Sequence, residues 1–379
     1  MIIGRFTARA ILFFLCSWIW SQPFHAVAQE RIKIAYSSAD ASNFVWYAAL
    51  DTGFYKKNGL EVDLIFIPSS TTSVSSVVAG DVQVANNSGG AVANAAVGGA
   101  SVIMTACYIN TLPYELVVHE SIKSAEDLKG KSVGISRVGS ASDVAARALV
   151  KGLGLEPVKD VPILQVGGAP ERAAAFRTGR IAGFPSPPGI IHLAKSMPHR
   201  ILISTADLQK RFDFPYICST TTKGFLTAHR DTVSRITMAL IEATQFLKTR
   251  KEESKKLIAK YSRQNNTAYL ESSYVAVAKL HDRVPLVTRE GTEVQIKEAL
   301  ARKPGASLRV EDLSMTALSG SSKRTALLIS FTSKRLWIRY DRCCDPFRRR
   351  IESHGATQGA ASHRRRSVCR KDCFDVKIN

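Results

Sequence analysis

The feature that most constrains the fold is a unit that recurs along the chain: a short strand, a loop rich in serine, threonine and asparagine, and then a helix. Residues 32–36 are β-rich, and the loop SSADAS over 37–42 leads into a predicted helix over 43–51. Further strands are predicted over 61–67, 82–85, 102–106 and 132–135, and a second helix over 143–150 with a capping box at its start. Alternating strands and helices are typical of an α/β fold with largely parallel sheets.

The loops of this repeated unit indicate a binding site. Ligands of open α/β sheets bind outside the carboxyl ends of the strands, where helix N-termini present unpaired N–H groups and partial positive charge. Several such loops together would form a polar pocket without a catalytic base. The alternative is that serine, threonine and asparagine stand there only because they are good N-cap residues.

The candidate ligand-binding residues are the polar side chains of these loops. They are Ser38, Asp40, Asn43, Ser69, Ser70, Thr71, Asn87, Ser88, Arg137, Ser140, Ser142 and, in a proline-rich stretch, Ser186.

Three of the chemical choices at this site stay open. Arg137 is either a bidentate partner for an anion or a solvated charge at the rim. Asp40 would repel a simple anion, and it favours an amine or a ring N–H instead. Aromatic side chains in the same regions are either stacking surfaces for an aromatic ligand or, as is commoner for aromatics, core residues; these are Phe44, Trp46, Phe184 and Tyr216.

The N-terminus has the pattern of a secretory signal. Arg5 and Arg9 precede an apolar stretch over 10–20, Pro23 interrupts it, and the small residues of AVA over 26–28 predict cleavage between Ala28 and Gln29. We therefore expect a soluble, exported, periplasmic protein. The alternative is an uncleaved anchor, but eleven apolar residues cover only about 16 Å of helix, short of a bilayer.

The net charge of +20 would ordinarily suggest nucleic acid or an anionic membrane as a partner. Residues 315–379 contain fifteen Lys/Arg and five Asp/Glu, and the leader adds two arginines, so residues 29–314 carry only +8. The charge therefore belongs mainly to the ends of the chain, and we expect no nucleic-acid partner for the body.

Three segments of the body resemble the periplasmic substrate-binding proteins of ABC importers of the nitrate, sulfonate and taurine type. Residues 53–62 read GFYKKNGLEV, residues 79–85 read AGDVQVA, and residues 124–134 read SAEDLKGKSVG. These segments are similar to the family patterns G-F/Y-F/Y-x-x-x-G-L-x-V, A-G-E/D-V-D-x-A and S-x-x-D-L-K-G-K-x-V-G. The resemblance covers about residues 31–313.

The resemblance implies a two-lobe periplasmic-binding-protein fold of type II, with the ligand cleft between α/β lobes joined by two crossovers. We place the crossovers near 111–119 and 216–224, which gives lobe I as 29–113 plus 225–313 and lobe II as 114–224. Residues 231–261 would form helices that pack on lobe I. Lobe closure would deliver a small polar organic or anionic solute to a membrane permease, and we expect a monomer.

An enzyme is the main alternative, because a thiamin-pyrimidine synthase branch looks similar and shares this scaffold. Its cysteine-rich motif is absent from the body, as are G-x-S-x-G, H-E-x-x-H and phosphate-loop motifs. The histidines show no metal-ligand spacing. We therefore predict a non-enzymatic binding protein with no cofactor and no metal. A sensory binding protein that signals to a receptor is a second alternative.

The body contains two cysteines, Cys107 and Cys218, each in an apolar stretch. In an oxidising compartment they could pair, but cysteines of this kind are more often buried thiols, and we favour the thiol.

From residue 314 the family resemblance stops, and the basic sequence over 314–379 shows no convincing periodicity. We favour an aberrant, disordered tail of frameshift or read-through origin. A basic arm for anionic lipid or nucleic acid and a cysteine metal site are the alternatives.

Overall fold

The computed structural model describes residues 30–187, 189–190, 197–208 and 213–315, together with three short strands nearer the C-terminus. The chain divides into Met1–Glu30 and Arg31–Asn379, and apart from Glu30 the described residues all belong to the second unit. The predicted signal peptide and its cleavage site lie outside the described residues.

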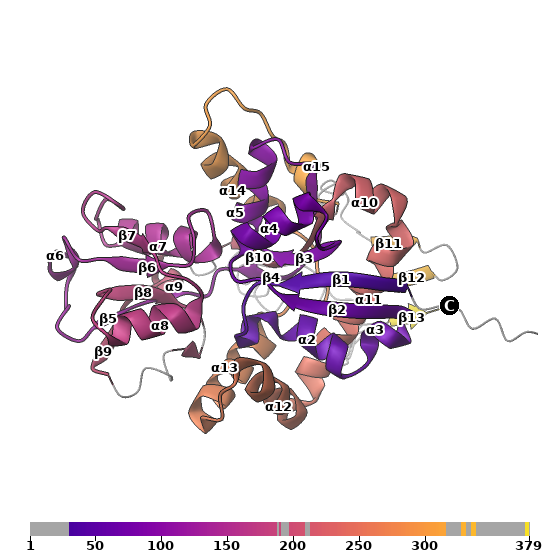
Figure 1. Cartoon of the computed structure of the whole chain (residues 1–379), viewed down its shortest axis with the longest axis horizontal. Helices are drawn as coiled ribbons and strands as arrows, with labels where there is room; N and C mark the ends of the chain where they lie inside the picture. The colour runs from indigo at the N-terminus through magenta and orange to yellow at the C-terminus, as the bar shows by residue number, and fades with distance from the viewer. Residues whose placement is uncertain are drawn as a thin grey trace, which may run out of the picture. The chain divides into compact units, whose positions relative to one another are not determined.

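The first sheet has five strands in the order β2-β1-β3-β10-β4 (Figure 1). The register pairs β1 with β3 in parallel, whereas β10 runs antiparallel to both β3 and β4. β10 lies between β3 and β4, and eight of its ten residues are buried. The strands are β1 (Glu30–Tyr36), β2 (Leu60–Phe66), β3 (Val84–Asn87), β4 (Val102–Thr111) and β10 (Asp213–Thr222).

The second sheet also has five strands, in the order β7-β6-β8-β5-β9. The pairs β6–β7 and β6–β8 are parallel, and β5 is antiparallel to β8 and β9. Both sheets are thus mixed, and the expectation of largely parallel sheets holds only for part of each. The strands are β5 (Glu115–His119), β6 (Val133–Ile135), β7 (Ile163–Gln165), β8 (Gly183–Ser186) and β9 (His199–Ser204).

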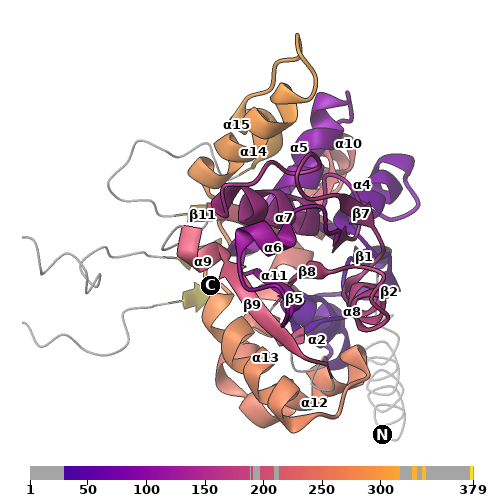
Figure 2. The same ribbon diagram turned by 90° about the vertical axis from the view of Figure 1, so that its left-hand side faces the viewer.

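Helices flank both sheets. Around the first sheet, α5, α14 and α15 lie on one side and α2, α12 and α13 on the other (Figures 1 and 2). The helices of this part are η1 (Ala41–Asn43), α2 (Phe44–Asp51), α3 (Phe54–Lys57), α4 (Ser70–Ala79), α5 (Gly89–Val97), α10 (Lys223–Ala228), α11 (Arg230–Thr249), α12 (Lys251–Ser262), α13 (Thr267–Leu280), α14 (Arg289–Ala301) and α15 (Val310–Leu313). Those beside the second sheet are α6 (Ala125–Leu128), α7 (Ala141–Gly152), α8 (Ala169–Arg177) and α9 (Thr205–Leu208).

The long helix α11 shows why the C-terminal part of the body returns to the first sheet. Val233, Ile236, Leu240 and Leu247 recur at helical spacing and are buried. They form one apolar stripe of the kind that must pack against another element. This stripe faces α2 and α3, so the helix packs beside the first sheet.

Two connections join the sheets. The first is short, because β4 ends at Thr111 and β5 begins at Glu115. The second runs from α9 to β10, and β10 belongs to the first sheet. The predicted second crossover at 216–224 is therefore wrong: the chain has returned to the first sheet by Asp213. A sequence pattern shows that residues 213–222 form a buried strand, but not which sheet accepts it.

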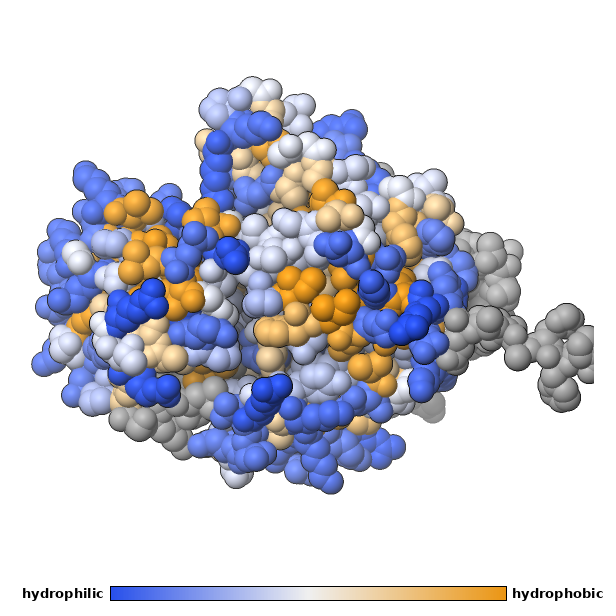
Figure 3. Space-filling model, viewed as in Figure 1, coloured by the Kyte–Doolittle hydropathy of each residue, from blue (hydrophilic) through white to orange (hydrophobic). Residues whose placement is uncertain are grey.

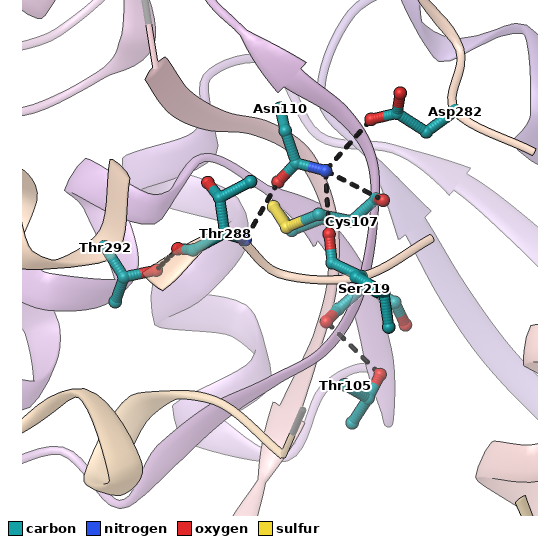
Figure 4. The surroundings of a disulfide bond; sticks show 9 residues. Thr105, Cys107, Asn110, Ser219, Asp282, Thr288 and Thr292 are labelled. Atoms are coloured by element: carbon teal, nitrogen blue, oxygen red, sulfur yellow. Dashed lines mark hydrogen bonds between the residues drawn. A yellow bond between two sulfur atoms is a disulfide. The ribbon is translucent and has the colours of Figure 1, made fainter. Parts of the chain in front are cut away.

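Cys107 and Cys218 form a disulfide, so the preference for buried thiols is wrong (Figure 4). Cys107 of β4 and Cys218 of β10 are direct register partners, with Cα atoms 3.9 Å apart. Their separation of 111 residues hid this pairing from the sequence. The disulfide joins the two strands that lead into and out of the second sheet.

The tail contributes a three-stranded antiparallel sheet of β11 (Leu327–Ser330), β12 (Arg335–Ile338) and β13 (Val376–Ile378). These residues depart from the expectation of a tail without regular structure. The other residues of 316–379 lie outside the described part of the chain, and for them the expectation stays a prediction.

Candidate functional site

A polar pocket lies where loops of the first sheet meet loops of the second. Its empty volume is about 470 Å³, including the part that opens to solvent. From the first sheet come Ser37, Ser38, Asp40, Asn43, Ser69, Ser70, Ser88, Tyr216 and Ile217. From the connection and the second sheet come Tyr114, Ser136, Ser140, Ala141, Ser142, Gly168, Ala169 and Arg172.

Four helices begin at this pocket. The N-cap residues of α4, α5, α7 and α8 are Ser69, Ser88, Ser140 and Gly168, and all four line it. Neither Ser69 nor Ser88 uses its hydroxyl to cap its own helix, and Ser69 Oγ is buried without a partner. Four helix N-termini concentrate free N–H donors and partial positive charge at one place, which suits an anionic group.

The second sheet contributes a triangle of three hydroxyls. Ser136 Oγ lies 2.9 Å from Ser140 Oγ and 3.0 Å from Ser142 Oγ, and the latter two are 2.9 Å apart. Ser140 caps α7 by accepting from the Asp143 N–H at 3.4 Å. The Asp143 carboxylate accepts from the Gly139 N–H at 2.8 Å, so the predicted capping box is present only in its first half.

Asp40 supplies the negative charge of the pocket. It follows β1, is 6% exposed, and accepts from the Ser42 N–H at 2.8 Å and from the Ser38 hydroxyl. Asn86 of β3 fixes the same loop, since its Nδ2 donates to Ser37 Oγ at 3.1 Å and to Asn43 Oδ1. These bonds hold the Asp40 carboxylate at the pocket wall.

Arg172 supplies the positive charge, from the first turn of α8. Its side chain is buried, with the residue 3% exposed, and Nη1 and Nη2 donate to the carbonyls of Gly167 at 3.0 Å and Pro185 at 3.4 Å. Nε is buried without a partner. Burial lowers the pKa of the Arg172 guanidinium, and Tyr114, Tyr216 and Asp40 oppose that shift.

A pair of tyrosines stands where the two sheets connect. Tyr114 Oη and Tyr216 Oη lie 3.2 Å apart, and both residues are buried. Burial raises the pKa of Tyr114 to about 12, so both phenols are neutral donors at physiological pH. Thr205 fixes the neighbouring backbone, since its Oγ1 accepts from the Tyr114 N–H at 3.2 Å.

The structure brings eight of the predicted site residues into this pocket: Ser38, Asp40, Asn43, Ser69, Ser70, Ser88, Ser140 and Ser142. The other four lie elsewhere. Thr71 bonds to the Val138 carbonyl at 3.3 Å, Asn87 is buried in β3, Arg137 is exposed, and Ser186 bonds to the Pro187 carbonyl at 3.1 Å. Whether any of the twelve binds a ligand stays a prediction.

Sequence reasoning missed Arg172 and considered Arg137 instead, either as a partner for an anion or as a solvated charge at the rim. Arg137 lies in a serine-rich loop, whereas Arg172 sits in a helix of ordinary polar composition, APERAAAFR. The sequence did carry one sign of an unusual backbone turn here, because two glycines, Gly167 and Gly168, directly precede this helix. In the structure Gly167 adopts φ +128°. Of the aromatic candidates, Tyr216 lines the pocket, while Phe44, Trp46 and Phe184 are core residues.

Other functional features are sparse. Among the described residues no group of His, Cys, Asp and Glu could hold a metal ion. Within the same part of the chain, no helix is both long and apolar enough to cross a membrane. Exposed apolar side chains include Phe66 and Val78 near the first sheet and Val138 and Leu164 near the second. Apolar surface gathers near β1 and near β7 (Figure 3).

Two mixed α/β sheets with a pocket between their loops are the architecture of the periplasmic-binding proteins, and solved structures confirm this fold. A protein of Bordetella bronchiseptica RB50 matches with TM-score 0.66 and 18% identity, over 76% of this chain and 95% of its own. The alkanesulfonate-binding protein of Xanthomonas axonopodis pv. citri, bound to MOPS, matches with TM-score 0.60 and 18% identity, over 72% and 90%. The periplasmic nitrate-binding protein of Synechocystis PCC 6803 matches with TM-score 0.60 and 13% identity, over 76% and 86%.

The family follows from the sequence itself. The family model described as NMT1/THI5 like matches residues 42–254, more than half of the chain, and the protein therefore belongs to this family. None of the curated proteins matches the chain in sequence. The predicted family and the predicted fold class are both confirmed.

Proposed function

We propose that this protein is the solute-binding component of an ABC importer, which captures a small polar solute between two lobes and releases it unchanged to a membrane permease. The observation that carries the proposal is the pocket, in which four helix N-termini and two buried charges converge from both sheets. Fixed donors of this kind bind a ligand tightly. Two of the structural relatives named above are binding proteins for alkanesulfonate and nitrate.

Each of the two proposed lobes is built around one of the two sheets. Lobe I comprises residues 29–113 and 225–313 with strand β10 added, and lobe II comprises residue 114 to the end of α9. Ligand contacts from both lobes would shift the equilibrium toward a closed form. We further propose a periplasmic monomer that is exported by the signal peptide over 1–28.

The pocket favours binding over catalysis. It contains hydroxyls, two tyrosines, Asp40 and Arg172, but none of the residues that line it is a histidine or a cysteine. The Ser38 hydroxyl donates to the Asp40 carboxylate, but no histidine at the wall stands beside a hydroxyl as its base. The family also makes a thiamin-pyrimidine enzyme the second candidate, and the fate of the ligand separates the two.

The test is a thermal-shift screen of the mature protein against alkanesulfonates, MOPS, taurine, nitrate, carboxylates and thiamin pyrimidines. A ligand at about a hundred times its Kd stabilises by about 2.7 kcal/mol, which raises Tm by several degrees. We expect at least one hit that mass spectrometry recovers unchanged. A hit that is consumed would replace the importer by an enzyme, and a folded protein without any hit would contradict the proposal.

The partner is tested separately. The permease of the importer should bind the ligand-loaded protein more tightly than the empty one, because only the loaded protein holds both lobes closed. A chemoreceptor that responds to the loaded protein, with no transport by a permease, would favour the sensory alternative.

A further inference from the structure

The pocket contains two opposite charges that do not neutralise each other directly. Asp40 lies at the end of β1 in the first sheet, and Arg172 lies in α8 beside the second sheet. In the described part of the chain, no carboxylate lies within 4.0 Å of the Arg172 guanidinium and no cationic nitrogen lies within 4.0 Å of the Asp40 carboxylate. Both residues are nevertheless more than nine-tenths buried.

A buried charge without a close partner is costly. The bonds that Arg172 makes go to neutral carbonyls, and its Nε is aimed at no acceptor. The bonds that Asp40 accepts come from a neutral N–H and a neutral hydroxyl. Each charge is thus held in place by neutral groups, and each retains capacity for a ligand of opposite charge.

The two charged side chains offer different chemistry to a ligand, although helix N-termini from both sheets reach the pocket. Arg172 lies in the first turn of α8, beside the N-terminus of that helix. The hydroxyl triangle of Ser136, Ser140 and Ser142 also comes from the elements beside the second sheet. These groups suit an anion, because they offer hydrogen-bond donors and partial positive charge. Asp40 accepts only, so it suits an ammonium or another charged N–H donor.

From this separation we infer that the solute is a small zwitterion, whose anionic group binds Arg172 and whose cationic group binds Asp40. The inference rests on the proposed solute-binding function and narrows it to one class of ligand. Because the two charges belong to different sheets, a zwitterion links them, whereas an ion with a single charge binds one and leaves the other with only the longer-range attraction between Asp40 and Arg172.

The test compares zwitterions with their singly charged analogues by isothermal titration calorimetry. The zwitterions are taurine, β-alanine and 4-aminobutyrate, the anions are ethanesulfonate, propionate and butyrate, and the cations are ethylamine and propylamine. We expect the best zwitterion to bind at least about tenfold to a hundredfold more tightly than its matched anion or amine, since each lost group is a charge-assisted hydrogen bond.

Variants of Asp40 and Arg172 test which end of the zwitterion each residue binds. Asp40→Asn keeps an acceptor for the Ser42 N–H, and it should weaken the zwitterion at least tenfold while leaving the matched anion unchanged or tighter. Arg172→Gln should weaken the zwitterion and the anion alike, and Arg172→Lys should restore part of the affinity for both. Asp81→Asn and Arg177→Gln change exposed residues and should change nothing.

Two outcomes would overturn the inference and leave the proposed function intact. One is a wild-type protein that binds an anion, an amine or a neutral solute as tightly as every zwitterion. The other is an Asp40→Asn variant that weakens zwitterion and anion equally. If folded protein binds no compound of the three sets and none of the thermal-shift panel, the proposed function fails and the inference falls with it.

Discussion

His281 is a buried side chain whose protonation links folding to pH. Its Nδ1 lies 2.9 Å from the Val277 carbonyl, and its Nε2 is buried without a partner. Burial lowers the pKa of His281 to about 4, with a smaller lowering by Lys248, although the bond to Val277 opposes the shift. The folded chain therefore keeps this imidazole neutral at pH values where the unfolded chain protonates it.

The sign of the pH effect follows directly. Above about pH 6.5 neither state is protonated. Between about pH 6.5 and 4 only the unfolded state gains a proton, so the free energy of unfolding decreases as the pH is lowered, by up to about 3 kcal/mol. Urea denaturation at pH 7, 5.5 and 4.5 should show this slope in the wild type. His281→Gln should flatten it, while His229→Gln, at an exposed position, should not. An unchanged slope in His281→Gln would exclude the effect.

Gly183 shows a constraint of packing. A Cβ there would lie 2.7 Å from the Val117 carbonyl oxygen and 2.8 Å from Val118 Cγ1, because β8 lies directly against β5. Gly183→Ala should therefore lower the free energy of unfolding by about 1–3 kcal/mol. Gly224→Ala, where a Cβ meets nothing within 4 Å, is the matched control and should be neutral or slightly stabilising. Equal effects of the two changes would contradict this account.

The residues of the pocket also show how far the sequence predicts a site. Eight of the candidates meet there because each follows a strand or opens a helix, which is a local property that a sequence displays. Arg172 was missed because its role depends on burial between Gly167 and Pro185, which are five and thirteen residues away along the chain. Ordinary helical sequence gives no sign of that burial.

At the scale of elements, the pair β4–β10 connects the two sheets and carries the disulfide. Each strand of the pair also brings a segment to the pocket: Tyr114 follows β4, and Tyr216 and Ile217 belong to β10. The short segment over 282–288 packs on β4 through Asn110, whose Nδ2 donates to Asp282 at 3.1 Å and to the Leu286 carbonyl at 2.7 Å (Figure 4). β4, the strand that leads into the second sheet, is thus held by the disulfide and by this segment.

The disulfide closes a loop of 111 residues that contains the whole second sheet. The chain-entropy relation for a loop of this length gives an upper value of about 4–5 kcal/mol of stabilisation. We expect the double variant Cys107→Ala/Cys218→Ala to lose several kcal/mol in urea denaturation. Dithiothreitol should destabilise the wild type to a similar degree and leave the double variant unaffected, whereas a double variant as stable as the oxidised wild type would contradict the prediction.

Strands and helices could be predicted from the sequence where their apolar residues are periodic, but the pairing of the strands could not. The strand over 32–36 and the helix over 43–51 were located to within two residues of β1 and α2. The placement of β10 in the first sheet and the opposition of Cys107 and Cys218 both depend on contacts across more than a hundred residues. Such pairing is decided by tertiary packing, so a local pattern cannot display it.

For the whole molecule, the proposed function requires that one solute be held by both lobes at once. The helix N-termini that line the pocket belong to α4 and α5, beside the first sheet, and to α7 and α8, beside the second sheet. Their first backbone N–H groups lack helical partners, so a solute that fills the pocket should shield them from exchange. Amide exchange can therefore report on each lobe separately.

The most direct measurement is hydrogen–deuterium exchange with and without a saturating amount of the tightest-binding compound from the screen. We predict slower exchange over residues 69–73 and 88–92 and, in the same experiment, over residues 140–144 and 168–172. The exposed helix α12 is the internal reference and should exchange unchanged. Protection confined to one of the two sets, or absent from both despite measured binding, would contradict capture between the lobes.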